Sequence, residues 1–337
     1  MTALKIAALA LVVVLAAGCH SMITSAPRPS PFKPGSSSSA PGSSPSAPSS
    51  PACTTSAAKG SCGPYADPQI DGYTDGGPVV DNNVWNPIPG WQQALTATGP
   101  GTWTATSNIP AGNTSVVAGP LTQAVYTRGD NTPNPLSGYS SLYSSFNHTG
   151  PGPGTGNSNS YDVGYDIWTG TGSSNNWGWE TMIWTDQENR SGSGSAPGCA
   201  DVPQVASGIQ FGGSNGVPVQ TWNLCQNGSG VNNQELIWYR PAGQETSGSV
   251  DILAMLTWEE NHGYIPAGSG LNGIDYTFEI CSTGGTNQKF QVNSFSITAT
   301  RLSRPVPAVP TQPVTVCLTV LTARQGPEPG SHGPQAP

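Results

Sequence analysis

Two glutamates stand among aromatic and apolar residues in short segments that are typical of β-strands. Glu180 lies in the segment 179–184, and Glu279 lies in a second segment of the same kind. Because alternate side chains of a strand face opposite ways, Glu180 shares its face with Met182 and Trp184. Apolar surface beside a carboxyl group makes a poor solvated face. It suits acid/base or nucleophilic chemistry on a ligand that stacks on rings.

Two further strand-like segments place a polar side chain beside a tryptophan. Asp166 faces the same way as Trp168, and Asn83 faces the same way as Trp85. Stacked rings beside carboxyl groups are typical of a cleft for a sugar chain, so the pattern favours a glycosidase with a pair of carboxyl groups. A single glutamate in a strand is more often a solvated outward residue, and that interpretation stays open for Glu180 and Glu279.

The composition predicts an all-β protein outside the cytoplasm. Of 337 residues, 9% are charged, against roughly 25% in average chains, and the net charge is −8. This charge argues against nucleic acid as a partner. The 10 Trp and 10 Tyr residues argue against a disordered chain, and 43 Gly with 33 Pro argue against a helix bundle.

One segment differs from the strand pattern and predicts a helix over 250–262. Ser249 is a candidate N-cap, apolar residues follow at helical spacing, and Gly263 can end the helix. We expect this helix to pack on the sandwich. Two acids late in the helix, Glu259 and Glu260, are expected to be solvated.

The first 19 residues have the pattern of an export signal. A lysine precedes an apolar run that is too short to span a bilayer, and the run ends in small residues before Cys19. This end is similar to a bacterial lipobox, which predicts lipidation of Cys19 and attachment to a membrane. Ordinary secretion is the alternative. The expected location is extracellular or the cell envelope.

The composition changes along the chain and predicts four parts. A signal peptide spans 1–19, and a Ser/Pro-rich linker that cannot bury enough apolar area to fold spans 20–62. One β-sandwich domain spans 63–302. A Pro-rich tail without a packed core spans 303–337.

Apart from Cys19, six cysteines remain, and an even number in an exported chain predicts disulfides. Fifteen connectivities are possible for six cysteines, and proximity in sequence favours two pairs. The histidines do not have the spacing of metal ligands, so we expect no metal and no cofactor. The favoured pairs are Cys53–Cys62 and Cys199–Cys225, which leaves Cys281 and Cys317.

Four segments, taken in order, resemble motifs of glycoside hydrolase family 12. Single motifs of this length are weak, whereas four in the family's order over about residues 78–302 are specific. The segments are Val80-Asp81-Asn82-Asn83-Val84-Trp85, Gly164-Tyr165-Asp166-Ile167-Trp168, Trp179-Glu180-Thr181-Met182-Ile183-Trp184 and Phe278-Glu279-Ile280-Cys281-Ser282-Thr283-Gly284-Gly285.

This resemblance implies a β-jelly-roll of two curved antiparallel sheets with one helix, in which the concave sheet forms an open substrate cleft. It implies that Glu180 is the nucleophile, Glu279 the general acid/base and Asp166 the carboxyl group beside the nucleophile. Trp85 would stack on a sugar ring. The other substrate-binding residues that it implies are Asn83, Met182, Trp184 and Trp168.

The function that this resemblance implies is a retaining endo-β-1,4-glucanase. Because the predicted linker and tail hold too few aromatic residues for a cellulose-binding module, we expect action on soluble or amorphous β-glucans, and we expect a monomer. Three alternatives stay open: a xyloglucan-specific hydrolase, a non-catalytic carbohydrate-binding sandwich and a structural envelope lipoprotein. The partner is expected to be a β-1,4-glucan in the first case.

Overall fold

The structure is a computed structural model in which the chain divides into two units, residues 1–302 and 303–337. The predicted signal peptide, most of the predicted linker, the predicted tail, Cys19, Cys199 and Cys317 lie outside the described residues. The described residues are 52–57, 60–65, 77–127, 132–156, 158–171, 178–189, 202–227 and 234–302.

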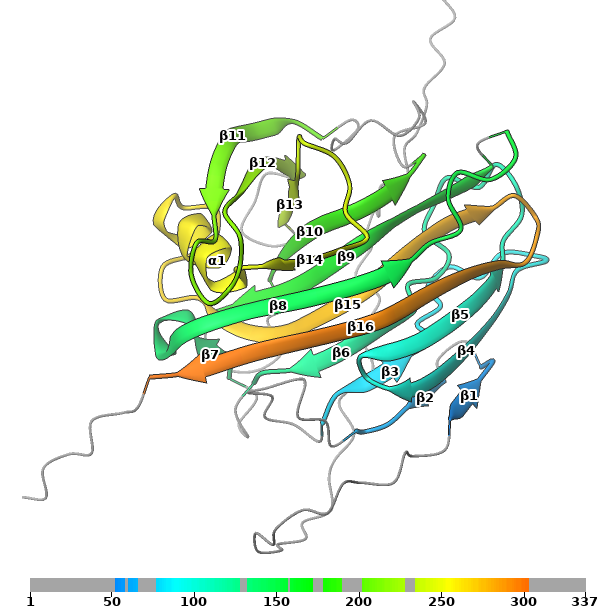
Figure 1. The fold of residues 1–337 in the computed structure, drawn as a ribbon, viewed down its shortest axis with the longest axis horizontal. Helices are drawn as coiled ribbons and strands as arrows, with labels where there is room; N and C mark the ends of the chain where they lie inside the picture. The colour runs from blue at the N-terminus through cyan, green and yellow to red at the C-terminus, as the bar shows by residue number, and fades with distance from the viewer. Residues whose placement is uncertain are drawn as a thin grey trace, which may run out of the picture. The chain divides into compact units, whose positions relative to one another are not determined.

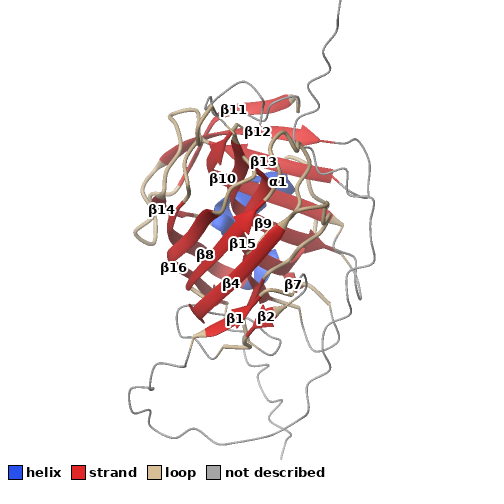
Figure 2. Cartoon of the chain, turned by 90° about the vertical axis from the view of Figure 1, so that its right-hand side faces the viewer, coloured by secondary structure: helices blue, strands red, loops and turns tan. Residues whose placement is uncertain are grey.

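Two β-sheets, packed face to face, form the described part of the first unit (Figures 1 and 2). Among the strands that the structure describes, the pairs are antiparallel except β10–β13, which is parallel. The predicted all-β sandwich is therefore confirmed. The smaller sheet has the order β1 (Cys53–Thr55), β4 (Gln92–Gly99), β5 (Thr102–Asn108), β16 (Gln288–Arg301), β8 (Tyr139–Thr149) and β14 (Ser247–Val250).

The larger sheet carries the segments in which the sequence places its candidate catalytic acids. It has ten strands, and the short strand β7 (Asn134–Pro135) pairs with the start of β15. The order of the other nine is β11 (Gln204–Phe211), β12 (Gln220–Asn227), β13 (Gln234–Tyr239), β10 (Trp179–Glu188), β9 (Asn159–Gly170), β15 (Gly270–Thr283), β6 (Leu121–Val125), β3 (Val79–Asp81) and β2 (Ser61–Cys62).

The two sheets differ in how many of their faces are buried. In β4, Leu95 and Ala97 are buried while Ala94 and Thr96 are exposed, which is the alternation of a sheet with one wet face. In β9, β10 and β15, side chains are buried on both faces. One face of the larger sheet belongs to the core, and the other is the face on which candidate chemistry lies.

Aromatic rings fill much of the space between the sheets. The rings of Tyr165 and Tyr276, from the larger sheet, have centroids 5.0 Å apart, and Tyr276 stacks on Phe295 of β16 at 4.8 Å. Pairs of this kind stabilise a core by about 0.5–1.5 kcal/mol each beyond the area that they bury. The core side of β9 and β15 is thus tightly packed, which fixes the direction of the side chains on their other face.

The last two strands, β15 and β16, follow one another through a short turn, but they belong to different sheets and do not pair with each other (Figure 1). β15 lies between β9 and β6, and β16 lies between β5 and β8. Gly284 and Gly285, in the turn between them, have φ angles of 65° and 72°, which only glycine adopts readily.

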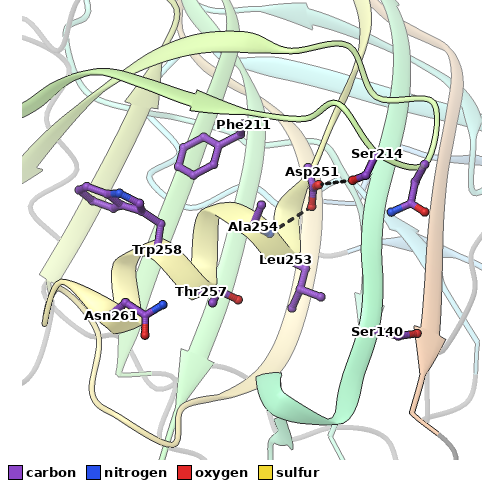
Figure 3. Close-up of a pocket in the computed structure, with 10 residues that line it drawn as sticks. Ser140, Phe211, Ser214, Asp251, Leu253, Ala254, Thr257, Trp258 and Asn261 are labelled. Carbon is purple, nitrogen blue, oxygen red and sulfur yellow. Dashed lines mark hydrogen bonds between the residues drawn. The ribbon is translucent and has the colours of Figure 1, made fainter.

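The helix α1 (Ile252–Asn261) lies within the predicted range 250–262. Its N-cap is Asp251, whose side chain accepts a hydrogen bond from the Ala254 N–H at 3.1 Å (Figure 3). The expectation that Ser249 caps the helix is therefore wrong, because the chain is still part of β14 there. The short 3₁₀ helix η1 spans Leu136–Gly138. The described part contains no helix that is both long and apolar enough to cross a membrane.

The domain begins earlier than the sequence predicted. β1 and β2 lie in the predicted linker 20–62, yet β1 pairs with β4 and β2 pairs with β3. A disulfide between Cys53 and Cys62 joins these two strands. The predicted linker boundary at residue 62 is therefore wrong, since pairing and a disulfide hold this polar segment where composition alone predicted no structure. Cys225 and Cys281 are disulfide-bonded as well.

Candidate active site

Carboxyl groups from three neighbouring strands gather on the face of the larger sheet that points away from the core, which we call the acidic face. All of them are buried or nearly so, although burying carboxyl groups near one another is costly. The acidic face carries Asp162 and Asp166 from β9, Glu180 from β10, and Asp275 and Glu279 from β15.

The strand register places these groups relative to β9, the middle strand. Glu180 lies opposite Trp168, which is half-buried, and Glu279 lies opposite Asp162. Asp166 therefore lies between the two glutamates along β9. Sequence parity placed Asp166, Glu180 and Glu279 on strands, and the register brings them to one face of one sheet.

Electrostatics also place Asp166 near both glutamates. Burial raises the pKa of Asp166 well above its ordinary value, and the negative charges of Glu279 and Glu180 raise that pKa further, followed by those of Asp275 and Asp162. The protonated form of Asp166 is therefore favoured. A protonated carboxyl group can donate a hydrogen bond to a neighbouring carboxylate.

The sequence analysis missed Asp162 and Asp275, although parity could have found them. Each lies four residues before a predicted site residue, so it must share that residue's face. The structure pairs Asp275 with Asp166 across the strands. The Gln123 Nε2 group donates to both carboxyl oxygens of Asp275, at 3.1 and 3.2 Å, which fixes its position.

A sixth acid, Glu235, has no supporting pattern around it in the sequence. It lies opposite Glu180 in the parallel pair β10–β13, and it is only half-buried. The Asn227 Nδ2 group donates to Glu235 at 2.9 Å. Glu235 therefore extends the row that contains Trp168 and Glu180.

The predicted ring platform, Trp85, lies beside β15. Its side chain is 38% exposed, and its backbone N–H donates to the Val117 carbonyl at 2.9 Å. A Cβ atom on Gly119 would lie 3.3 Å from Trp85 Cζ2 and 3.2 Å from Thr277 Oγ1. Trp85 and Thr277 are thus neighbours around Gly119, and Thr277 is two residues before Glu279 on the same face.

A tight turn holds Asn83 in the same neighbourhood. Asn83 has a φ of 40°, its N–H donates to Asp81 Oδ1 at 2.7 Å, and its carbonyl accepts from the Gly119 N–H at 2.9 Å. Asparagine tolerates this left-handed conformation better than most residues. The turn therefore brings Asn83 and Trp85 to the same part of the acidic face.

Met182 and Trp184 lie on the predicted side of β10 but are largely covered. They are 2% and 6% exposed and pack with Val202, Cys225 and Ile237 in a small apolar cluster. They form a floor beside the acids in this structure, whereas the sequence suggested a surface for stacking.

A β-bulge after Trp184 reverses the parity of the rest of β10. The register shifts by one residue, so Asp186 pairs with the core-facing Val163. Asp186 Oδ2 lies 3.3 Å from His148 Nε2, and His148 Nδ1 lies 2.8 Å from the Tyr276 hydroxyl. This network ties β10 to β8 of the smaller sheet and to β15.

Solved structures with known activities share this architecture. The xyloglucanase domain of NopAA from Sinorhizobium fredii, in complex with cellobiose, is 26% identical over 73% of this chain and 98% of its own, with a TM-score of 0.55. A family 12 xyloglucanase from Bacillus licheniformis is 15% identical over 73% and 100%, with a TM-score of 0.54. Endoglucanase cel12A from Rhodothermus marinus is 20% identical over 74% and 100%, with a TM-score of 0.53.

The chain has the glycoside hydrolase family 12 fold. No protein-family model and no curated protein sequence matches it. The structural neighbours are glycoside hydrolases, which supports a glycosidase.

Within this family 12 fold, one acid of the helix α1, Glu259, is not solvated as the sequence led us to expect. Glu259 is fully buried, which means that the expectation of a solvated side chain is wrong. It accepts hydrogen bonds from Thr181 Oγ1 at 2.8 Å and from Trp238 Nε1 at 2.6 Å. The signal was present: Ile252, Met255, Leu256 and Glu259 are spaced as one helix stripe.

A hollow of about 380 Å³ lies beside α1 (Figure 3). Phe211, Trp258, Thr257 and Asn261 line part of it. None of the candidate site residues lines this hollow. Among the described residues, no group of histidine, cysteine and acidic side chains is arranged to hold a metal ion.

Proposed function

We propose that this protein is a retaining endo-β-1,4-glucanase that acts on soluble or amorphous β-glucans. The observation that carries the proposal is the gathering of Glu180, Asp166 and Glu279 on one face of one sheet, with Trp85 beside them. Endoglucanases and xyloglucanases among the structural neighbours support it. A neutral polysaccharide also fits a chain with few charges.

The proposed reaction has two displacements. In the first, Glu279 gives its proton to the glycosidic oxygen while the Glu180 carboxylate attacks the anomeric carbon, and the bond to the leaving sugar breaks. In the second, the Glu279 carboxylate takes a proton from water, whose oxygen attacks the anomeric carbon and releases Glu180. Two inversions return the β configuration.

Asp166 has a supporting role in this proposal. As a neutral acid between two glutamates, it would donate a hydrogen bond to the Glu180 carboxylate during the reaction and would add no further negative charge beside it. This bond orients the nucleophile toward the sugar. It also lowers the repulsion that a third carboxylate would cause.

The test begins with full-length wild-type protein and two isosteric variants, Glu180→Gln and Glu279→Gln. On carboxymethylcellulose and barley β-glucan, wild type should lower the viscosity early relative to the release of reducing ends, as an endo-acting enzyme does. NMR of the first product should show the β anomer. The α anomer as first product would contradict a retaining mechanism, and full activity of Glu180→Gln would contradict the assigned nucleophile.

Azide separates the two roles, using dinitrophenyl β-cellobioside as the substrate. With Glu180→Ala, azide should replace the nucleophile and give the α-azide, while with Glu279→Ala it should replace water and give the β-azide. Glu260→Gln, on the helix, is the matched control with unchanged activity. A folded wild type that binds these glucans without hydrolysing them would favour a non-catalytic binding sandwich.

A xyloglucan-specific hydrolase is the second candidate. The neighbour that is 26% identical to this chain is a xyloglucanase domain. A kcat/KM on tamarind xyloglucan at least tenfold above that on barley β-glucan would favour this candidate, since tenfold corresponds to about 1.4 kcal/mol of discrimination.

A further inference from the structure

The helix α1 reaches the strand of Glu180 from the core side. Thr181, the next residue of β10, faces the core because side chains alternate, and its hydroxyl donates to Glu259. The opposite side of α1, with Thr257 and Asn261, faces the hollow (Figure 3). Glu259 therefore lies beneath the acidic face, on the reverse side of the strand that carries Glu180.

Both carboxyl oxygens of Glu259 are used, and they reach two adjacent strands. Oε2 accepts from Thr181 of β10, and Oε1 accepts from the indole N–H of Trp238 on β13. β10 and β13 run parallel here, with Thr181 opposite Leu236 and Trp238 opposite Ile183. One side chain of the helix thus holds two strands at a fixed spacing beside Glu180.

The two groups that hydrogen-bond to this carboxyl group are uncharged. The groups that face it from β10 and β13 are Thr181 and Trp238, and on its own helix Asp251 caps the N-terminus while Glu260 accepts from the Gly268 N–H. Burial raises the pKa of Glu259 to about 7, opposed by its two hydrogen bonds. When ionised, the carboxyl group accepts from both groups; when neutral, it donates to Thr181 Oγ1 through its protonated oxygen and still accepts from the Trp238 indole N–H through the other.

We propose that Glu259 is a positioning residue for Glu180: it fixes the backbone of β10 at Thr181, and thereby the point from which the nucleophile projects. This inference rests on the proposed function, in which Glu180 attacks the sugar. Reacting groups must be held close to attack geometry, and a displacement of about 1 Å can cost about 100-fold in rate. A bond to the adjacent residue acts directly on that geometry.

The test measures formation of the covalent intermediate in the full-length protein. The probe is dinitrophenyl 2-deoxy-2-fluoro-β-cellobioside, which labels a nucleophile and gives an inactivation rate constant and an inhibitor constant separately. Glu259→Met keeps the volume and removes both acceptors, and it should lower the rate constant about tenfold or more while the inhibitor constant stays within about twofold. Glu259→Gln keeps one acceptor and one donor, and it should stay within about threefold of wild type. Glu260→Gln, which keeps an acceptor for the Gly268 N–H, is the control.

The outcomes separate the inference from the function. The inference is overturned if Glu259→Met is labelled at the wild-type rate while a thermal unfolding transition shows that it is folded. It is also overturned if Glu259→Gln is labelled as slowly as Glu259→Met. If Glu259→Met does not fold, Thr181→Val decides: a slower rate constant supports the role, and a wild-type rate overturns it. A wild-type protein that neither hydrolyses glucans nor is labelled overturns the proposed function and this role with it.

Discussion

At the scale of single residues, the site combines acids that differ in environment. Asp166 is buried among other carboxyl groups, and its pKa is raised so that the neutral form is favoured. Glu235, in the row of Glu180, is half-buried and receives an amide hydrogen bond. The environments of these acids therefore differ, and differing environments are how a site with several carboxyl groups separates acid and base roles.

Asp166→Asn should retain more activity than Asp166→Ala. Asparagine still donates a hydrogen bond toward Glu180, whereas alanine removes it, and a hydrogen bond to a charged group contributes about 1.5–3 kcal/mol. We expect the alanine variant to have a kcat about 10–100-fold below that of the asparagine variant on barley β-glucan. Equal kcat values in the two variants would contradict a donor role for Asp166.

Trp85→Ala should mainly weaken substrate binding. The ring is partly exposed beside the acids, and covering such a ring with a sugar stabilises the complex by about 1–2 kcal/mol from apolar area alone. The expected result is a KM about 5–30-fold higher with kcat within about threefold. Trp91→Ala, at a partly buried ring that packs on the core, is a control for general loss of packing.

At the scale of elements, strand parity predicted the faces correctly where strands are regular. Trp179 and Ile183 pack in the core, while Glu180 lies on the opposite face. Parity failed after Trp184, because a bulge adds one residue and turns Asp186 into the core. A bulge has no sequence signature here, so the pairing of Asp186 with His148 could not be predicted.

Other features were out of reach of the sequence for a different physical reason. The segment that forms β1 and β2 has a polar composition, and it forms strands because β1 pairs with β4 and β2 pairs with β3. The register that sets Asp166 between Glu180 and Glu279 depends on pairs between distant segments. By contrast, the burial of Glu259 follows from helical spacing and was available.

Gly119→Ala should disturb the contact between the Trp85 loop and β15. The added methyl group would lie 3.2–3.3 Å from Thr277 Oγ1 and Trp85 Cζ2, which is too close for an ordinary contact. Because the exposed indole is the group that can move, we expect KM on barley β-glucan to rise about threefold or more with little change in melting temperature. Gly138→Ala, which meets nothing within 4 Å, is the matched control. An unchanged KM would show that the loop tolerates the shift.

At the scale of the whole molecule, the buried Glu259 makes stability depend on pH. Its pKa is about 7 in the folded protein and 4.5 in its ordinary environment, so the folded state binds the proton more tightly. Its neutral form is compatible with burial at low pH, and stability falls as the pH rises from about 4.5 to about 7, by about 3 kcal/mol in total.

Glu259→Gln should remove that part of the pH dependence. The melting temperature of wild type minus that of the variant should fall by roughly 5–12 °C between pH 4 and pH 8, since each kcal/mol shifts it by about 2–4 °C in a domain of this size. Taking the difference cancels Asp166, whose raised pKa acts in the same direction. A constant difference over this pH range would contradict the buried-acid assignment.

The disulfide Cys53–Cys62 should stabilise the domain without affecting the site. It closes a loop of nine residues and joins the first strands of the two sheets, so its loss costs about 2–3 kcal/mol. The double variant Cys53→Ser/Cys62→Ser should melt about 4–12 °C lower and keep its kcat. An unchanged melting temperature would show that strand pairing alone holds these strands.

The last two strands, β15 and β16, each lie in the interior of a sheet, and this placement has a consequence for the nascent chain. Without residues 270–301, the pairing within each sheet is interrupted: the smaller sheet is left as β1–β4–β5 and β8–β14, and the larger as β2–β3–β6 and β9 to β13, with β7 unpaired. Each piece has an open edge that is able to pair with another chain. The candidate site is incomplete at this stage too, since Glu279 arrives with β15.

Folding therefore waits for the C-terminal strands, which pair with β6 and β5, segments synthesised about 150 residues or more earlier. Long-range pairing of this kind is slow and leaves edges exposed to aggregation. A truncated messenger RNA, or proteolytic cleavage before residue 270, would leave fragments that are inactive and prone to aggregate. Holding the chain unfolded until its last strands are available is thus a requirement that this topology places on whatever machinery makes and delivers it.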